Sequence, residues 1–345
     1  MLLEQYRLTI EPPTTYARFR VAEERCTGCG RCVNACPMQL LEVVDKQVRS
    51  NQRYADFKCI TCQNCKASCT KEAITIEGDY RVHRGFWRND HLFLATKTPP
   101  QPPEKARNSS SEQFRDQLTE TERIILARRS IRLYRKKPVE VDKLERIIEA
   151  GRFAPSAGNN QPWRFIVVRN RQVIDEINDR CKKALRRGSY LLMPHAYLDK
   201  RTPGPTDARY TWWQKVVIPF LVRLRAGDVE PRARGGINTA TSDPDYHIFF
   251  RAPVLIILLA DRRGIGSVQL DTGICGQNMV LAAHALGLGT CWVSLIRGLN
   301  YFPDYLKQLG IEDPFQVITA ITVGYPSGRI DKVVAREPAR VHWVD

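Results

Sequence analysis

Eight of the eleven cysteines fall in two short runs with the same spacing, C-x2-C-x2-C-x3-C. The first run is Cys26, Cys29, Cys32 and Cys36, and the second, 33 residues later, is Cys59, Cys62, Cys65 and Cys69. Three thiolates spaced in this way wrap three irons of one cubane, whereas the fourth cannot comfortably return to it and reaches the other. The spacing predicts two [4Fe–4S] clusters with crossed ligands. The expected sets are Cys26, Cys29, Cys32 and Cys69, and Cys59, Cys62, Cys65 and Cys36.

Zinc is the alternative metal that four cysteines could bind, but zinc sites usually show two Cys-x-x-Cys pairs separated by a longer loop. The sequence after each run repeats as well, as Met38-Gln-Leu-Leu-Glu-Val and Lys71-Glu-Ala-Ile-Thr-Ile, so each half should continue into a turn and a strand. Gly28 and Gly30 leave room for backbone N–H groups near the sulfurs. The segment resembles a bacterial two-cluster ferredoxin over about residues 20–80, with Thr70 where that family usually has proline.

Composition and charge limit the class of protein. A chain of 345 residues suggests about two domains, and its many cysteines indicate metal or redox chemistry rather than disulfides. The longest apolar run, 253–260, is too short for a bilayer, and no secretory signal is visible, so a cytoplasmic location is expected. The net charge of +16 would favour acidic partners or substrates. No nucleic-acid-binding motif is present, and nucleic acid is not an expected partner.

The predicted organisation is a ferredoxin-like domain at 1–90, a linker at 91–117 and a second domain at 118–345. The linker is inferred from the Pro- and Ser-rich stretch 97–113. Thr119 and Glu122 have capping-box spacing and predict a helix start. Further helices are expected around Leu144–Ile148 and at 269–285, and strands at 165–168, at 253–260 and up to Val323-Gly. Both domains are of the α+β class.

Four segments of the second domain form an ordered set. They are Arg128-Arg-Ser-Ile-Arg132, Ala154-Pro-Ser-Ala-Gly-Asn-Asn-Gln-Pro-Trp163, Leu286-Gly-Leu-Gly-Thr-Cys-Trp292 and Val323-Gly-Tyr-Pro326. Alone, the arginines would be solvated side chains that complement a helix dipole. Together, the segments resemble the FMN-dependent nitroreductase family over about residues 118–340. The resemblance implies a nitroreductase-like α+β fold and a homodimer with one FMN in each of two clefts at the subunit interface.

The resemblance also implies which residues contact FMN. Arg128, Arg129 and Ser130 match the positions that hold the phosphate and ribityl chain. Arg132 matches the basic position beside N1 and O2 of the ring, where a cation stabilises the anionic reduced flavin. The loop residues Pro155, Ser156, Asn159 and Gln161 match positions along the isoalloxazine and ribityl, partly supplied by the other subunit.

Two later positions complete the implied FMN contacts. Ser294 matches the residue whose backbone N–H faces flavin N5, although the acidic-glycine pair of many relatives is missing here. Arg336, after Gly-Tyr-Pro, matches a C-terminal basic residue on the phosphate. No catalytic side chain is assigned. The remaining cysteines, Cys181, Cys275 and Cys291, are interpreted as unreactive thiols of the core or surface, and none of the six histidines has ligand spacing.

The resemblance is interrupted at about 188–246. From 181 to 250 there are twelve Lys and Arg against six Asp and Glu. Three interpretations compete: a roof over the flavin cleft, a surface helix that touches a membrane or redox partner, and a decoration packed on the core. The roof is favoured from its position in the fold, and Pro219 disfavours a long membrane-lying helix. The flat rings of Tyr210, Trp212 and Trp213, with the cations of Lys215, Arg223 and Arg225, would suit an anionic aromatic or conjugated substrate.

The two domains together predict a reductase. An external low-potential donor, with ferredoxin the main candidate, would reduce the clusters, the clusters would reduce FMN, and FMN would reduce a small molecule. No Gly-x-Gly-x-x-Gly motif follows a strand, although relatives often use NAD(P)H directly in the flavin cleft. A dehydrogenase running in reverse and a non-catalytic electron-transfer or sensing protein are the alternatives. Nitroaromatics, quinones, activated alkenes and halogenated phenols remain open as substrates.

Overall fold

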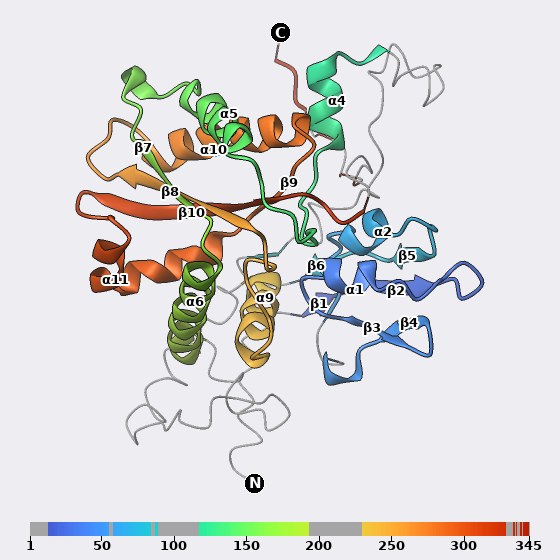
Figure 1. Ribbon diagram of the computed structural model, residues 1–345. Coiled ribbons are helices and arrows are strands. Elements are labelled where there is room, and N and C mark those ends of the chain that lie inside the picture. The colour runs from blue at the N-terminus through green and yellow to red at the C-terminus, as the bar shows by residue number, and fades with distance from the viewer. Residues whose placement is uncertain are drawn as a thin grey trace, which may run out of the picture. The chain divides into compact units, whose positions relative to one another are not determined.

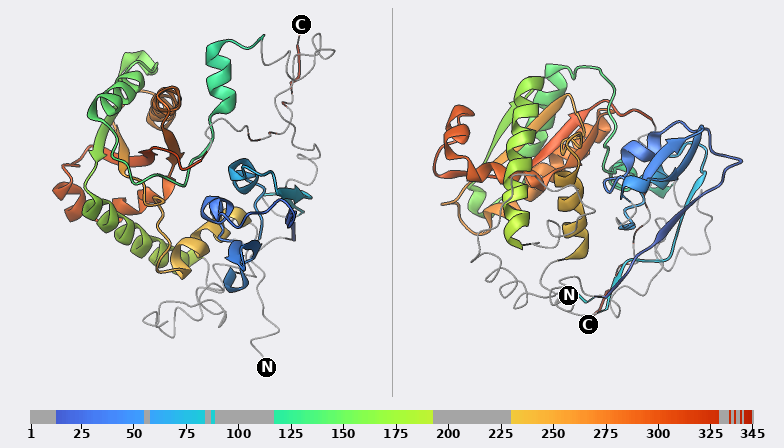
Figure 2. Two further views of the ribbon diagram at one scale, coloured as in Figure 1. Left: turned by 45° about the vertical axis from the view of Figure 1, so that its right-hand side comes forward. Right: turned by 90° about the horizontal axis from the view of Figure 1, so that it is seen from below.

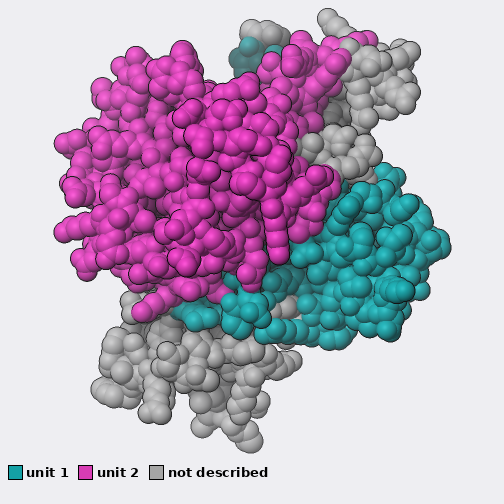
Figure 3. Space-filling model, viewed as in Figure 1, with its two compact units in different colours: residues 1–99, 186–246, 335–345 teal, residues 100–185, 247–334 magenta. Residues whose placement is uncertain are grey.

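The computed structural model describes residues 13–54, 58–83, 87–88, 117–192 and 230–328, with 334, 336, 339 and 341–344 near the C-terminal end. The chain divides into two compact units (Figure 3). Unit 1 comprises Met1–Pro99, Arg186–Tyr246 and Ala335–Asp345, and unit 2 comprises Pro100–Leu185 and His247–Val334. Among the described helices, none is both long enough and apolar enough to cross a membrane.

The N-terminal part of unit 1 is built from short elements (Figure 1). Three antiparallel pairs form its strands: β1 (Thr14–Thr15) with β6 (Arg81–Val82), β2 (Arg18–Val21) with β5 (Ile74–Glu77), and β3 (Leu41–Val44) with β4 (Gln47–Ser50). The helices are α1 (Arg31–Ala35), α2 (Asn64–Ser68) and the 3₁₀ turn η1 (Gln52–Tyr54). β3 and β5 follow the two cysteine runs, which confirms the predicted turn and strand in each half.

The internal repeat extends to individual backbone angles. Four pairs of residues, each 33 positions apart, have positive φ in both halves. The pairs are Gly28 and Thr61 (64° and 54°), Gly30 and Gln63 (69° and 57°), Gln39 and Glu72 (52° and 53°), and Asp45 and Gly78 (50° and 75°). Left-handed backbone is costly for a residue with a Cβ atom. The second half therefore adopts, with Thr61 and Gln63, the turns that glycine makes easy in the first.

The predicted insertion is described only at its ends. The long helix α6 (Arg171–Leu192) leads into it, and α9 (Pro231–Ser242) comes near its end. Residues 193–229 lie outside the described residues, and with them the aromatic and basic side chains of the predicted roof. The described helix α9 belongs to unit 1, with the cysteine-bearing domain. The sequence did not predict this grouping.

Unit 2 is organised around one antiparallel sheet with the strand order β7-β8-β10-β9. Its strands are β7 (Trp163–Val168), β8 (Val254–Asp261), β9 (Gly289–Trp292) and β10 (Phe315–Gly324). Helices α5 (Val141–Arg152) and α10 (Val268–Ala285) cover one face, and α6 lies on the other (Figures 1 and 2). The remaining elements are α4 (Glu120–Ala127), η3 (Ala157–Asn159), η4 (Ser294–Tyr301) and α11 (Pro303–Gln308).

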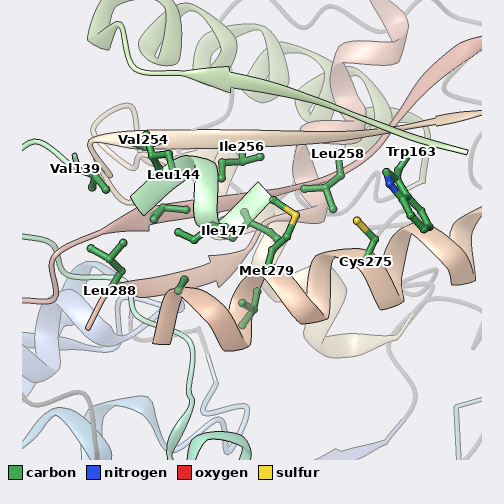
Figure 4. Close-up of a cluster of buried hydrophobic side chains, with 14 of the residues drawn as sticks. Val139, Leu144, Ile147, Trp163, Val254, Ile256, Leu258, Cys275, Met279 and Leu288 are labelled. Carbon is green, nitrogen blue, oxygen red and sulfur yellow. The ribbon is translucent and has the colours of Figure 1, made fainter. Parts of the chain in front are cut away.

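The predicted elements of unit 2 are confirmed. Thr119 and Glu122 form a complete capping box at the start of α4. The apolar run 253–260 becomes β8, which is buried on both faces. Val254, Ile256 and Leu258 pack in a cluster with residues of α5 and α10 (Figure 4), and the alternate side chains of β8 are buried as well. A strand covered on both sides needs apolar residues at every position, which explains the continuous run.

Gly276 on α10 marks the closest approach of this helix to the sheet. A Cβ atom at this position would lie 2.8 Å from Cδ2 of Leu258 and would also meet the ring of Trp292. Gly273, one turn earlier on the same helix, has nothing within 4 Å of such a Cβ. Close packing therefore requires glycine at 276 but not at 273.

We expect Gly276→Ala to destabilise the protein and Gly273→Ala to leave it unchanged or slightly stabilised. Overpacking of a core costs about 1–3 kcal/mol, whereas alanine at an uncrowded helical position gains about 0.5–1 kcal/mol over glycine. The urea midpoint followed by circular dichroism measures both. Equal midpoints for the two variants would contradict the close approach.

Candidate functional site

One cavity of unit 1 collects cysteines from both halves of the repeat. Its lining includes Cys26, Cys29 and Cys32 from the first run and Cys69 from the second. The cavity measures about 310 Å³, its mouth included. Two cationic residues, Arg25 and Lys71, also line it, and Cys29 is exposed. These are the four cysteines of the first predicted ligand set.

A second cavity, of about 350 Å³ with its mouth, has the complementary set. Cys59, Cys62 and Cys65 line it together with Cys36 of the first run. Its other lining residues are uncharged: Phe19, Pro37, Met38, Leu40, Leu41, Ile60, Gln63 and Ile76. Among the residues that the structure describes, cations therefore line the first cavity and not the second.

Burial makes several of these cysteines reluctant to ionise in the absence of a metal. It raises the pKa of Cys32 and of Cys36 to about 11 and raises that of Cys65 further still. At Cys36 the backbone opposes this rise in pKa, because the backbone at Met38 and Leu40 hydrogen-bonds to the sulfur. Ala73 N also donates to Cys69 Sγ at 3.3 Å. N–H groups directed at sulfur are the donors that a cluster-bound thiolate uses.

The donor sets fit clusters better than single ions. Within the described ranges, no three His, Cys, Asp or Glu side chains are placed to hold one metal ion. The cysteines instead surround cavities, four to each. Four thiols around a volume are the arrangement that a cubane requires, because each sulfur binds a different iron.

In unit 2 the arginine-rich segment lies along strand β9. Ser130 forms a parallel bridge with Thr290, and Ile131 N donates to Thr290 O at 2.8 Å. A Cβ atom at Gly289 would lie 2.7 Å from the Ile131 side chain, so glycine is needed there for the two segments to meet. This contact explains why the first predicted segment and the Leu-Gly-Leu-Gly segment occur together.

The cationic side chains of this segment are partly enclosed. Arg129 is buried, and the guanidinium of Arg132 lies 5.4 Å from the ring centroid of Phe250. The hydroxyl of the half-buried Tyr134 donates to Ile131 O at 2.7 Å and lies 2.7 Å from Thr322 Oγ1 of β10. Three guanidinium groups and a serine within five residues form a donor set suited to a phosphate or another anion.

The predicted loop 155–161 is held at the start of helix α10. Ala157 N donates to the buried Asp271 carboxylate at 3.3 Å. Within the loop, Gln161 N donates to Ser156 Oγ at 3.0 Å, and Gln161 Nε2 donates to Asn159 Oδ1 at 3.2 Å. Pro155, Asn159 and Gln161 are exposed. The loop therefore exposes polar groups, and hydrogen bonds hold its backbone in place.

One chain does not bring all the predicted FMN residues together. Figure 4 shows Trp163, just after the loop, at one end of the core cluster, and Leu288, just before Gly289, at the other. The loop and the arginine segment therefore belong to opposite ends of the same core. Ser294 is exposed at the start of η4. Arg336 is exposed and belongs to unit 1, whereas the other predicted FMN residues belong to unit 2.

Sequence reasoning did not find the residues that support Arg132. Phe250 and Arg251 both have left-handed backbone, with φ of 55° and 51°. The turn before them is fixed by His247, whose Nδ1 accepts from Phe249 N at 3.2 Å, so that Nε2 carries the hydrogen and donates to Asp175 at 2.9 Å. The sequence signal, two aromatic residues after a histidine, is too common to indicate this role.

The three cysteines outside the two runs are interpreted from the sequence as unreactive thiols of the core or surface. Cys181, Cys275 and Cys291 are all buried, so they are core residues. Burial raises the pKa of Cys181 and that of Cys275 to about 12, which makes them unreactive. His247 is buried and holds the turn before Phe250 through its two ring nitrogens.

Comparison with known proteins identifies both parts of the chain. The nitroreductase family matches residues 125–325, and a 4Fe–4S dicluster domain matches residues 18–77. The chain is 24% identical over 228 residues to an Archaeoglobus fulgidus protein whose name combines NADH dehydrogenase and NAD(P)H nitroreductase; the alignment covers 65% of this chain and 98% of that protein. A nitrobenzene nitroreductase of Ectopseudomonas oleovorans is 26% identical over 204 residues, which are 59% of this chain and 85% of that protein.

Among solved structures, a nitroreductase with bound FMN from Bacteroides fragilis is similar to this chain. It has a TM-score of 0.45 and 24% sequence identity, and the match covers 66% of this chain and 100% of the other.

The buried His247 predicts a pH dependence of stability. Burial lowers its pKa to about 4, from about 6.5 in the unfolded chain. Between these values the unfolded chain binds a proton that the folded chain does not, so the free energy of unfolding decreases as the pH falls. His247→Gln cannot titrate. We expect wild type to lose about 2 kcal/mol more than this variant between pH 7 and pH 5, from urea unfolding at both pH values. Parallel pH profiles would contradict the assignment.

Proposed function

Because the chain belongs to the nitroreductase family and carries a 4Fe–4S dicluster domain in front of it, we propose that it is a flavin-dependent reductase supplied by its own iron–sulfur clusters. An external low-potential donor, ferredoxin or a similar protein, reduces the clusters, which pass electrons to FMN and on to a conjugated organic molecule. The observation that carries this proposal is the pair of four-cysteine cavities on the same chain as a nitroreductase fold.

We propose the crossed ligand sets for the clusters. Cys26, Cys29, Cys32 and Cys69 would bind cluster I, and Cys59, Cys62, Cys65 and Cys36 would bind cluster II. The cavity linings support this division, since each cavity takes its fourth cysteine from the other half of the repeat. The buried thiols would ionise as iron binds, because thiolate rather than thiol is the metal ligand.

For FMN we propose Arg128, Arg129 and Ser130 as the phosphate and ribityl site and Arg132 as the cation beside N1 and O2. When bound, FMN would take up two single electrons and a proton and could deliver them together as a hydride. The guanidinium of Arg132 suits the negative charge of the reduced ring, and its packing over Phe250 restricts its position. Ser294 and Arg336 remain proposals for the N5 and phosphate contacts.

We propose that the FMN site is completed in a homodimer. The loop with Pro155, Ser156, Asn159 and Gln161 and the arginine segment lie at opposite ends of one core, so a partner subunit would supply the missing half. Apolar side chains near the loop support an interface there: Phe153 is 71% exposed, and Ile265 and Leu270 are each 61% exposed. Sedimentation of the purified chain should give the mass of a dimer. A monomer that binds FMN would contradict this proposal.

The substrate stays a prediction from the sequence. The aromatic and basic residues that favoured an anionic conjugated molecule lie in 193–229, outside the described residues. The relatives are named for nitrobenzene and NAD(P)H nitroreductase activity. Nitroaromatics and quinones are therefore the first substrates to test, with ferredoxin and NAD(P)H compared as donors.

The electron route is tested by removing the clusters. Anaerobically purified wild type should contain about eight iron per chain, and the double variant Cys29→Ala/Cys62→Ala much less. The double variant should retain FMN and reduce substrate when dithionite reduces the flavin, because the residues proposed to bind FMN, except Arg336, belong to unit 2. It should fail when reduced ferredoxin is the only donor. Normal turnover with ferredoxin, measured as substrate loss, would contradict the proposed route.

The flavin site is tested at Arg132. Arg132→Ala should weaken FMN binding by about 10- to 100-fold, since a hydrogen bond to a charged group contributes about 1.5–3 kcal/mol. It should also lower the flavin midpoint potential, because the cation favours the reduced ring. Arg132→Lys keeps the charge and should recover part of both effects. Arg135→Ala, an exposed arginine of the same segment, is the control. Unchanged FMN binding and potential in Arg132→Ala would remove this residue from the site.

A further inference from the structure

The first turn of helix α9 is attached to the iron–sulfur domain by a cluster of three side chains. The Glu230 carboxylate accepts from Ala233 N at 3.0 Å and so caps the helix. It also accepts from the Tyr80 hydroxyl at 2.5 Å and from Arg232 Nε at 2.7 Å. The Arg232 guanidinium lies 4.5 Å from the Tyr80 ring centroid. Tyr80 is buried and the Glu230 side chain is 14% exposed, whereas Arg232 remains on the surface.

One turn further along, α9 comes very close to Met38. A Cβ atom at Gly235 would lie 2.6 Å from Met38 Cε, whereas one at Gly236 would have nothing within 4 Å. Glycine weakens the interior of a helix, so it usually has a local reason there. The contact with Met38 supplies that reason at 235.

Met38 connects α9 with the second cavity. Its side chain is 3% exposed and lines that cavity together with the proposed ligands of cluster II. It also follows Cys36-Pro37 directly, and its backbone hydrogen-bonds to Cys36. Among the described residues, none of α9 lines either cavity, and Met38 lines only the second.

We propose that α9 holds Met38 as an apolar wall over cluster II and thereby lowers the reduction potential of that cluster relative to cluster I. The inference rests on the cluster assignment of the proposed function. Reduction adds negative charge to a cluster, and an apolar, water-poor surrounding disfavours added charge. At cluster I the exposed Cys29 and the cations Arg25 and Lys71 favour reduction. Positioning residues act at cluster II: Tyr80 and Glu230 attach α9 to the iron–sulfur domain, Gly235 lets α9 approach Met38, and Met38 is held beside cluster II.

The experiment is a redox titration of the holoprotein followed by electron paramagnetic resonance. Cys29→Ser and Cys62→Ser first assign the two midpoints, because each should shift only the cluster it ligates. If wild type holds no clusters, or neither variant shifts a midpoint, the proposed function itself fails. With two assigned midpoints, the wall over cluster II is tested separately.

Gly235→Leu should displace Met38 and raise the midpoint of cluster II. We expect about a tenfold change in the equilibrium constant of its reduction, which is about 59 mV for a one-electron couple. The midpoint of cluster I should not move. Gly236→Leu, on the same helix with open space around it, should leave both midpoints unchanged. Equal shifts in the two glycine variants, or no shift of cluster II in Gly235→Leu, would overturn the proposal.

A second pair of variants tests the wall directly and does not depend on α9 tolerating leucine. Met38→Ala should raise the cluster II midpoint, because water can enter where the side chain was. Met38→Leu preserves an apolar side chain of similar size and should restore the wild-type value. A cluster II midpoint that is the same in Met38→Ala and wild type would overturn the proposal even if Gly235→Leu fails to fold.

Discussion

The iron–sulfur domain depends on one constraint: neither cysteine run can complete a four-cysteine site alone. Cys36 lines the cavity of the second run, and Cys69 lines that of the first. Both halves must therefore adopt the same local backbone and meet face to face. The left-handed residues at equivalent positions follow from this requirement, and the second half meets it with Thr61 and Gln63 in place of glycine. Strain accepted at these positions is consistent with a site that must be shaped before metal binds.

In the nitroreductase fold, the arrangement of the elements depends on glycines that allow close packing. Gly289 allows Ile131 to lie against β9, and Gly276 allows α10 to lie against Trp292 and Leu258. These contacts fix the arginine segment to the sheet, while Asp271 fixes the loop at the other end of the core. A single fold thus presents two half-sites, and the proposed FMN site follows from joining them across two subunits.

Helix α9 changes the interpretation of the insertion. Its position before β8 in the sequence suggested a role in the flavin cleft, yet α9 contacts Tyr80 and Met38 of the iron–sulfur domain as well as Arg186 of α6. Among the described residues, the two cavities are therefore unequal: cations line the first, whereas uncharged residues line the second, including a side chain that α9 touches. On the proposed cluster assignment, this difference would give electrons a preferred direction, which two equivalent clusters would not.

Local patterns in the sequence were sufficient for much of this protein. Cysteine spacing predicted which four cysteines line each cavity, the capping box predicted the start of α4, and continuous apolarity predicted β8. Each of these patterns depends on residues a few positions apart. The sequence could not indicate that Phe250 packs under Arg132, that His247 braces that turn, or that Gly235 meets Met38. These pairs are 118, 72 (His247 with Asp175) and 197 positions apart in the chain. Only tertiary packing brings them together, because such contacts depend on shape and burial and leave no periodic pattern in the sequence.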